Sequence, residues 1–274
     1  MAITFVSAAS SYSASVIKTV TANNLVIFMA SGTPAAWGTP VSSGAGTTGS
    51  WTAVDEATNV GNVTAKMWWA KVTGSGSLTV TISGPGDLGC SIHEYSGADT
   101  TSPIDTNGNA TGTSVDAGLT LNGVDNGSVV VGIAACESPS TMTADSPYTQ
   151  QTYESTHVHA TLDYIVPSAG SYSPNMSLGT STSWAFVGAA FLVSGAPAWA
   201  GPTFKAAGTF TAGQSSITPP YPTGGDAPVS GDIAILVVES ENQAITLTTA
   251  NGFAEQGEQA NKNAGTAATD PASR

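Results

Sequence analysis

Charged side chains are scarce in this sequence of 274 residues. They make up 9% of the chain, 19 acidic against 6 basic, and give it a formal net charge of −13. A typical soluble protein has about 25% charged residues. Nucleic acids and anionic membrane surfaces are bound through clusters of Lys and Arg, and a chain whose single arginine is Arg274 cannot supply such a cluster. We therefore expect no nucleic-acid partner.

Long apolar runs are missing as well. No window approaches the roughly 18 apolar residues of a membrane-spanning helix, so we expect no membrane insertion. The first seven residues contain no basic side chain, and no apolar core of a signal peptide follows them. The sequence thus predicts synthesis in the cytoplasm without a secretion signal, although its many small hydroxyl residues are typical of proteins that work outside the cell.

Cysteine is nearly absent. Cys90 and Cys136 are the two that occur, which is too few for a disulfide framework. They fall in different units of the repeat described next. We therefore expect two buried thiols that behave as small apolar side chains.

Short apolar runs are present, and they recur at a fixed interval. The runs begin at Leu25, Val129 and Ile233, so that each starts 104 residues after the one before it. Each follows a polar turn and consists of β-branched and other apolar residues. Such a run predicts a β-strand that is buried on both faces.

Other elements recur between the first two runs. An aromatic strand is predicted at 66–72 and again at 162–166, each followed by a hairpin. A last strand that ends in Ser-Gly-Ala is predicted at 92–98 and again at 189–196. Short strands with Gly, Ser and Asn turns and almost no helical period predict an all-β fold of tandem immunoglobulin-like or jelly-roll β-sandwich units.

The repeat predicts two whole units and one partial unit, at 1–97, 98–196 and 197–274. The third stops before its hairpin and last strand. Either the sequence is part of a longer chain, or another chain supplies the missing strands, or the stretch after about Gly257 is a tail of a partly formed unit. An alternative division takes 1–196 as one jelly roll whose strands exchange between the duplicated halves.

The segment 231–253 carries the most specific resemblance. Its Gly-Asp-led apolar strand, its polar Glu and Asn residues and its Asn-Gly-Phe turn resemble a repeat in structural proteins of tailed bacteriophages and prophages. Residues 67–71 and 92–97 resemble the aromatic and last strands of that repeat. The resemblance implies a virion component of the tail, fibre or head decoration. It also implies other virion proteins as partners, a possible homo-oligomer and exposure outside the host cell.

Two histidines are the strongest candidates for hidden chemistry. His157 and His159 lie two apart on a predicted strand and would share one face. Around a three-fold axis, such pairs could offer six nitrogens to a transition metal. The alternative is an exposed strand face beside Glu154 and Asp163.

Other ionisable residues offer weaker candidates. His93 and Glu94 are adjacent and would face opposite sides of a strand, so they could not act on one substrate atom. Asp55, Glu56 and the acidic residues of 99–105 could form a weak Ca²⁺ site, although their spacing matches no known calcium loop. Isolated solvated carboxylates are the alternative.

Trp68 and Trp69 are the candidate ligand-binding residues. Because they are neighbours on a strand, one should face the core and the other solvent or a partner. An outward aromatic ring can stack on a sugar, for example a host surface glycan.

We therefore expect a non-enzymatic virion protein without a cofactor, acting as a spacer or adhesion module. The acidic residues are scattered, and none forms the paired carboxylates that a glycoside hydrolase needs. A carbohydrate-binding module of a cell-surface or secreted protein is the alternative.

Overall fold

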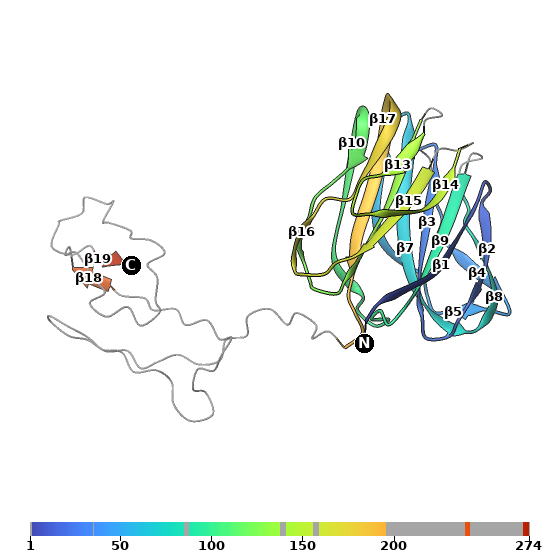
Figure 1. The fold of residues 1–274 in the computed structure, drawn as a ribbon, viewed down its shortest axis with the longest axis horizontal. Coiled ribbons are helices and arrows are strands. Elements are labelled where there is room, and N and C mark those ends of the chain that lie inside the picture. The colour runs from blue at the N-terminus through green and yellow to red at the C-terminus, as the bar shows by residue number, and fades with distance from the viewer. Residues whose placement is uncertain are drawn as a thin grey trace. The chain divides into compact units, whose positions relative to one another are not determined.

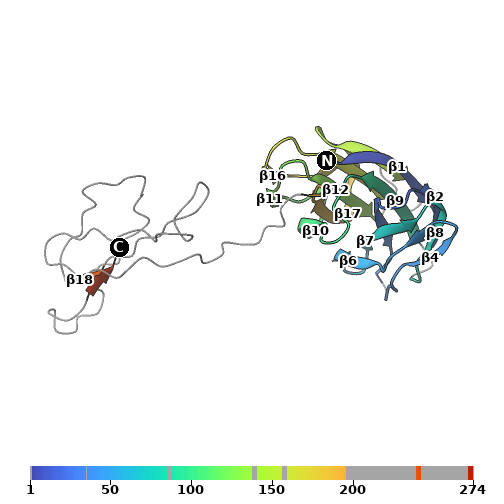
Figure 2. The same cartoon turned by 90° about the horizontal axis from the view of Figure 1, so that it is seen from below.

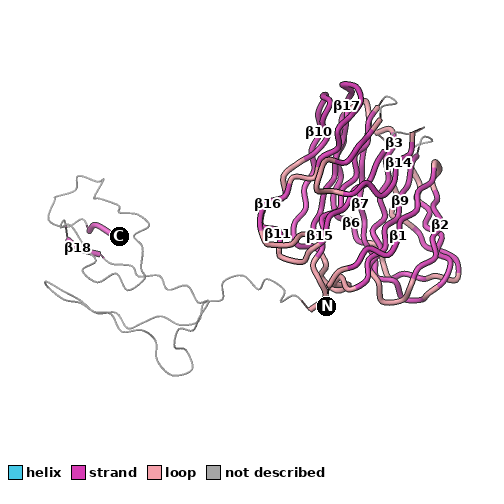
Figure 3. The backbone as a smooth tube through the Cα atoms, viewed as in Figure 1, coloured by secondary structure: helices cyan, strands magenta, loops and turns pink. Residues whose placement is uncertain are grey.

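A computed structural model describes residues 2–34, 36–84, 88–137, 141–155 and 159–195, and two short strands at 239–241 and 271–273. Residues Met1–Trp199 and Ala200–Arg274 form two separate units. Strands make up 70% of the described residues and helices are absent among them, which confirms the all-β prediction (Figure 1, Figure 3). The run at 233–238 lies outside the described residues, and the unit boundaries at 97 and 196 stay predictions.

The first half of the larger unit contains two antiparallel sheets. In the large sheet the strands follow the order β1 (Thr4–Ser11), β9 (Leu88–Ser96), β3 (Leu25–Gly32) and β7 (Val63–Gly74), and both β5 (Thr47–Thr48) and β6 (Thr52–Asn59) pair with β7. The three-stranded sheet has the order β2 (Ser15–Val20), β8 (Gly76–Thr81) and β4 (Val41–Gly44).

The second half repeats this plan. Its large sheet has the order β10 (Ile104–Gly118), β17 (Asn175–Phe191), β12 (Val129–Cys136), β15 (His159–Ile165) and β14 (Thr149–Glu154), and β13 (Met142–Ala144) also pairs with β17. A two-stranded sheet joins β11 (Leu121–Val124) to β16 (Gly170–Tyr172). In the other unit, β18 (Glu239–Glu241) pairs with β19 (Pro271–Ser273).

The two large sheets match in register as well as in strand order. Leu25 lies opposite Tyr95 of β9 on one side and Lys71 of β7 on the other. Val129, which is 104 residues later, lies in the same way between Phe191 of β17 and Ile165 of β15. Strands β1, β9, β3, β7 and β6 therefore correspond to β10, β17, β12, β15 and β14.

The irregularities of the edge strands repeat too. The register of β1 shifts at Val6, and the register of β10 shifts at the corresponding Asp105. The register of β6 shifts at Val54, and that of β14 at the corresponding Gln151. The first two of the three predicted runs thus occupy equivalent positions in two sheets of the same design.

The four sheets of the larger unit lie in layers. Figure 2 shows these layers from the two-stranded sheet of β16 and β11 at one side to the three-stranded sheet with β8 and β4 at the other. Side chains alternate along β3, so that Leu25 and Ile27 enter the core between the two large sheets while Val26 and Phe28 enter the core beneath the three-stranded sheet. Strand β12 divides its side chains in the same way between the shared core and the core beneath the two-stranded sheet. Both strands are buried on both faces, as their apolar runs predict.

The two cysteines are buried thiols and form no disulfide. Cys90 belongs to the core beneath the three-stranded sheet, and Cys136 to the core beneath the two-stranded sheet. Burial raises the pKa of each thiol to about 12. Both therefore stay protonated and serve as small apolar side chains, as the sequence predicts.

Candidate functional site

Strand β9 carries polar residues on both of its faces. Glu94 faces the three-stranded sheet, whereas His93 and Tyr95 face the second large sheet. His93 and Glu94 therefore point into different layers, as expected for neighbours on a strand, and each belongs to a separate polar cluster.

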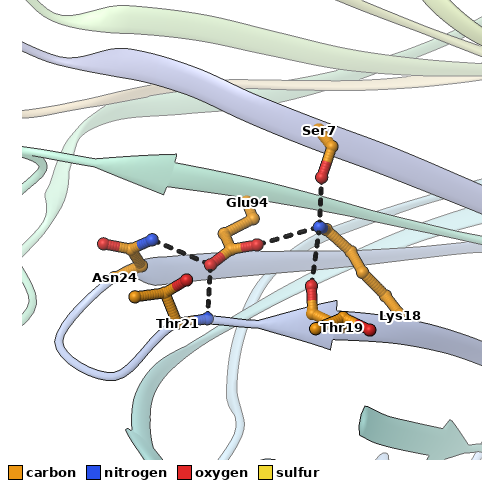
Figure 4. Close-up of polar contacts among 6 residues, drawn as sticks. All are labelled: Ser7, Lys18, Thr19, Thr21, Asn24 and Glu94. Atoms are coloured by element: carbon orange, nitrogen blue, oxygen red, sulfur yellow. Dashed lines mark hydrogen bonds and ion pairs between the residues drawn. The ribbon is translucent and has the colours of Figure 1, made fainter. Parts of the chain in front are cut away.

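The first cluster surrounds the carboxylate of Glu94 (Figure 4). Lys18 forms an ion pair with its Oε2 at 2.8 Å, while the backbone N–H of Thr21 and the amide of Asn24 donate to its Oε1 at 2.7 and 2.8 Å. Lys18 is 7% exposed and Glu94 is 1% exposed. Both charges have lost their water, so this ion pair depends on the hydrogen bonds around it.

The strand alternation explains why a lysine is buried here. On β2, Val16, Lys18 and Val20 all point inward beneath the three-stranded sheet. The Lys18 ammonium also donates to the Ser7 hydroxyl, and to the backbone oxygen of Thr19 at 3.2 Å (Figure 4). With three acceptors, all donors of the ammonium are used.

The second cluster joins β9 to β15 across the two large sheets, and we call it the polar ladder. Its three rungs each connect a residue of β9 with the residue 68 positions later in β15. The rungs are Ser91–His159 at 2.9 Å, His93–Thr161 at 2.8 Å and Tyr95–Asp163 at 2.9 Å. All six residues are buried.

Further bonds join the rungs to one another. His93 Nδ1 lies 3.1 Å from the Tyr95 hydroxyl, and the Thr152 hydroxyl lies 2.9 Å from that of Ser91 and 2.6 Å from that of Thr161. At the two ends, Ser31 bonds His159 Nδ1 at 3.0 Å and the Gln151 amide donates to Asp163 at 2.7 Å. The cluster is a continuous chain of hydrogen bonds from Ser31 to Asp163.

Burial shifts the pKa values of His93, Tyr95 and Asp163 in this chain. It lowers the pKa of His93 to about 3, with a smaller contribution from the charge of Lys18, so the imidazole is neutral. Burial raises the pKa of Tyr95 well above its ordinary value, and the nearby Asp163 carboxylate raises it further. Burial also raises the pKa of Asp163, while the hydrogen bonds from Gln151 and Tyr95 lower it in part.

The neutral imidazole of His93 and the protonated phenol of Tyr95 set the direction of the hydrogen bonds at this end of the chain. The Tyr95 hydroxyl donates to the Asp163 carboxylate, so the Nδ1–H of neutral His93 donates to Tyr95 and its Nε2 accepts from Thr161. The hydroxyls farther along can then donate in the same sense, Thr152 to Thr161 and Ser91 to Thr152. Aligned hydrogen bonds in a dry layer polarise and strengthen one another, which favours a rigid connection between the sheets.

His159 lies within this chain. It is completely buried between Ser31 and Ser91. The alternative prediction, that this residue lies on an exposed strand face, is therefore wrong. His157 lies outside the described residues, and a metal site shared by His157 and His159 stays a prediction. The described residues contain no group of three side chains placed to hold a metal ion.

The carboxylates considered for Ca²⁺ are engaged in hydrogen bonds. Asp55 accepts the amides of Asn107 and Asn109 at 3.0 and 2.9 Å, which joins β6 of one large sheet to β10 of the other. Asp99 accepts the backbone N–H of Thr101 at 2.6 Å in the connection between the halves. These carboxylates stabilise the junction between the two halves.

Trp68 and Trp69 point to opposite sides of β7, and each side is part of a core. Trp68 is 3% exposed and packs beside Phe28, whereas Trp69 is half-buried against the core between the large sheets. Sequence reasoning did not single out Trp51, which borders a shallow groove of about 460 Å³ formed by residues 39–42 and 48–51. Its indole N–H donates to the Ser42 hydroxyl at 2.9 Å.

The described part of the chain contains no helix that could span a membrane. No protein-family model, curated protein or solved structure matches this chain.

Proposed function

We propose that this chain is a non-enzymatic structural protein of a bacteriophage particle, a spacer whose surface contacts other virion proteins or the host. The observation that carries the proposal is that the ionisable side chains most suited to catalysis are buried and used in structural contacts. The imidazoles of His93 and His159 and the carboxylates of Glu94 and Asp163 are buried and tie sheets together. Groups used in this way favour rigidity, which is what a spacer needs.

The outer face of the three-stranded sheet supports the same role. Ile17 of β2 and Val41 of β4 are 64% and 66% exposed, and the residues beside them in register are Ser and Thr. No charged side chain points outward from these three strands, since Lys18 is turned inward. An uncharged face can pack against another protein with little desolvation of ions.

Purified particles test the proposal. Phage particles released by lysis of cells that carry the gene should contain this chain in a fixed ratio to the major capsid protein, as measured by mass spectrometry. Antibodies against the chain should decorate one part of the particle in electron micrographs. A chain found in the cell lysate and absent from purified particles would contradict the proposal.

Carbohydrate binding is the second candidate, and the Trp51 groove favours it. The Trp51 indole packs in part beside Phe28, and its N–H and the hydroxyls of Ser42 and Thr48 bond one another. The part of the ring that lines the groove and the hydroxyls of Thr39 and Ser50 are what a sugar ring would stack on and bond. The test is a glycan array probed with the full chain and with Trp51→Phe and Trp51→Ala. Binding should persist with Phe and vanish with Ala, and the absence of any bound glycan on the original chain would exclude this function.

A further inference from the structure

The interface between the two large sheets has two halves, and an approximate two-fold symmetry that exchanges the sheets relates one half to the other. The register that matches Leu25 with Val129 also matches β9 with β17 and β7 with β15. In one half of the interface β9 bonds to β15, and in the other half β17 contacts β7. A symmetric interface would carry the same residues in both halves.

The two halves instead differ in chemistry. The counterpart of the polar ladder, which we call the apolar ladder, is made of the residues at the matching register positions. Those positions hold Val187, Ala189 and Phe191 in β17, and Ala65, Met67 and Trp69 in β7. These six side chains belong to the shared apolar core or pack against it.

The rungs also complement each other in size. The middle polar rung pairs the large His93 with the smaller Thr161, and the matching positions of the apolar ladder hold the small Ala189 in β17 and the larger Met67 in β7. Side chains of different size and polarity therefore occupy matching positions in the two ladders, and neither half of the interface repeats the other.

Pairing of like with like would break both ladders. If the first half of the chain met a second copy of itself through this face, His93 and Tyr95 would lie against an apolar β7 strand. If the second half met itself, the Asp163 carboxylate would lie against Phe191. In both cases buried polar groups would lose their hydrogen-bond partners, which is strongly unfavourable.

We propose that this interface is a heterotypic pairing surface, in which the inner face of residues 2–97 accepts the inner face of residues 104–195 and rejects a second copy of itself. The apolar ladder supplies contact area and the polar ladder supplies discrimination. The partner that fits each face is the complementary half, from the same chain or, by exchange, from a second copy.

A cleaved full chain tests this directly. A protease site inserted between the exposed residues Thr101 and Ser102 allows the chain to be cut into its two halves after folding. Cleaved protein with and without isotope labels is mixed, unfolded in urea, refolded and examined by native mass spectrometry. Mixed pairs of first and second halves should exceed like pairs by at least tenfold, whereas like pairs in comparable amounts would overturn the proposal.

A measurement on the uncut chain covers the case in which the fragments do not refold. His93→Ala and Thr161→Met together copy the middle rung of the apolar ladder. Each single change should lower the urea midpoint because it leaves one polar partner alone, and the double change should recover at least half of the summed loss. Strictly additive losses would overturn the proposal, and Ser43→Ala on an exposed strand position is the control that should change nothing.

Discussion

Tyr95 and Asp163 lie 68 residues apart, in different sheets, and are joined by a buried hydrogen bond of 2.9 Å from the phenol to the carboxylate. Tyr95→Phe removes this bond and the acceptor of the His93 N–H. We expect a loss of about 1–3 kcal/mol in the free energy of unfolding, measured by urea denaturation. Tyr172→Phe, which removes an exposed bond to Ser168, is the matched control and should cost less than about 0.5 kcal/mol.

The buried ion pair gives a second prediction. Lys18→Met leaves the Glu94 carboxylate without its cation in a dry layer, and we expect a loss of about 3–5 kcal/mol in the free energy of unfolding. Adding Glu94→Gln should restore part of it. The matched control is Lys66→Met, which breaks the more exposed pair with Glu56 and should cost less than about 1 kcal/mol. Equal losses from Lys18→Met and Lys66→Met would refute a special role for the buried pair.

The stability of the fold should depend on pH through His93. Its pKa is about 3 in the folded chain and about 6.5 in the unfolded chain, so below pH 6.5 the unfolded chain binds the extra proton. The free energy of unfolding should therefore fall as the pH drops from 6.5 towards 3. The raised pKa of Asp163 acts in the opposite sense, because its ionisation above the unfolded pKa disfavours the fold.

Urea denaturation at pH 7 and pH 5 checks this prediction. His93→Asn, which cannot titrate, should show a smaller loss between the two values than the original chain. If the original chain and the variant lose the same stability on acidification, His93 is not the group responsible.

Gly89 gives a steric prediction. A Cβ atom at this position would lie 2.3 Å from His159 Nδ1, which is far inside van der Waals contact. Gly89→Ala should therefore displace the imidazole from Ser31 and lower the thermal midpoint. Gly123→Ser, at a glycine of β11 with a φ of +74° and nothing within 4 Å of a Cβ atom, is the comparison that separates backbone strain from this clash. A larger loss at Gly123 than at Gly89 would contradict the account.

The apolar runs at Leu25 and Val129 predicted much of the fold. Each is long enough for one strand and has no polar position, so burial on both faces followed from composition alone. The alternation of side chains along a strand likewise predicted that His93 and Glu94 point to opposite faces. These features are local, which is why a single sequence shows them.

The polar ladder could not be predicted in the same way. His159, Thr161 and Asp163 alternate with apolar residues along β15, and this pattern is also that of a strand with one solvent-exposed face. The signal that distinguishes the two cases is the matching Ser-x-His-x-Tyr pattern of residues 91–95, which lies in another sheet. Which polar faces meet is decided by tertiary packing, and neither strand contains that information by itself.

The central claim is that two like halves are locked face to face by a buried polar ladder, and a double-mutant cycle between Tyr95→Phe and Asp163→Asn tests it most directly. Because the two side chains touch across the sheets, we predict a coupling energy of about 1–3 kcal/mol from urea unfolding of the two single variants and the double variant. A coupling energy indistinguishable from zero would contradict the claim.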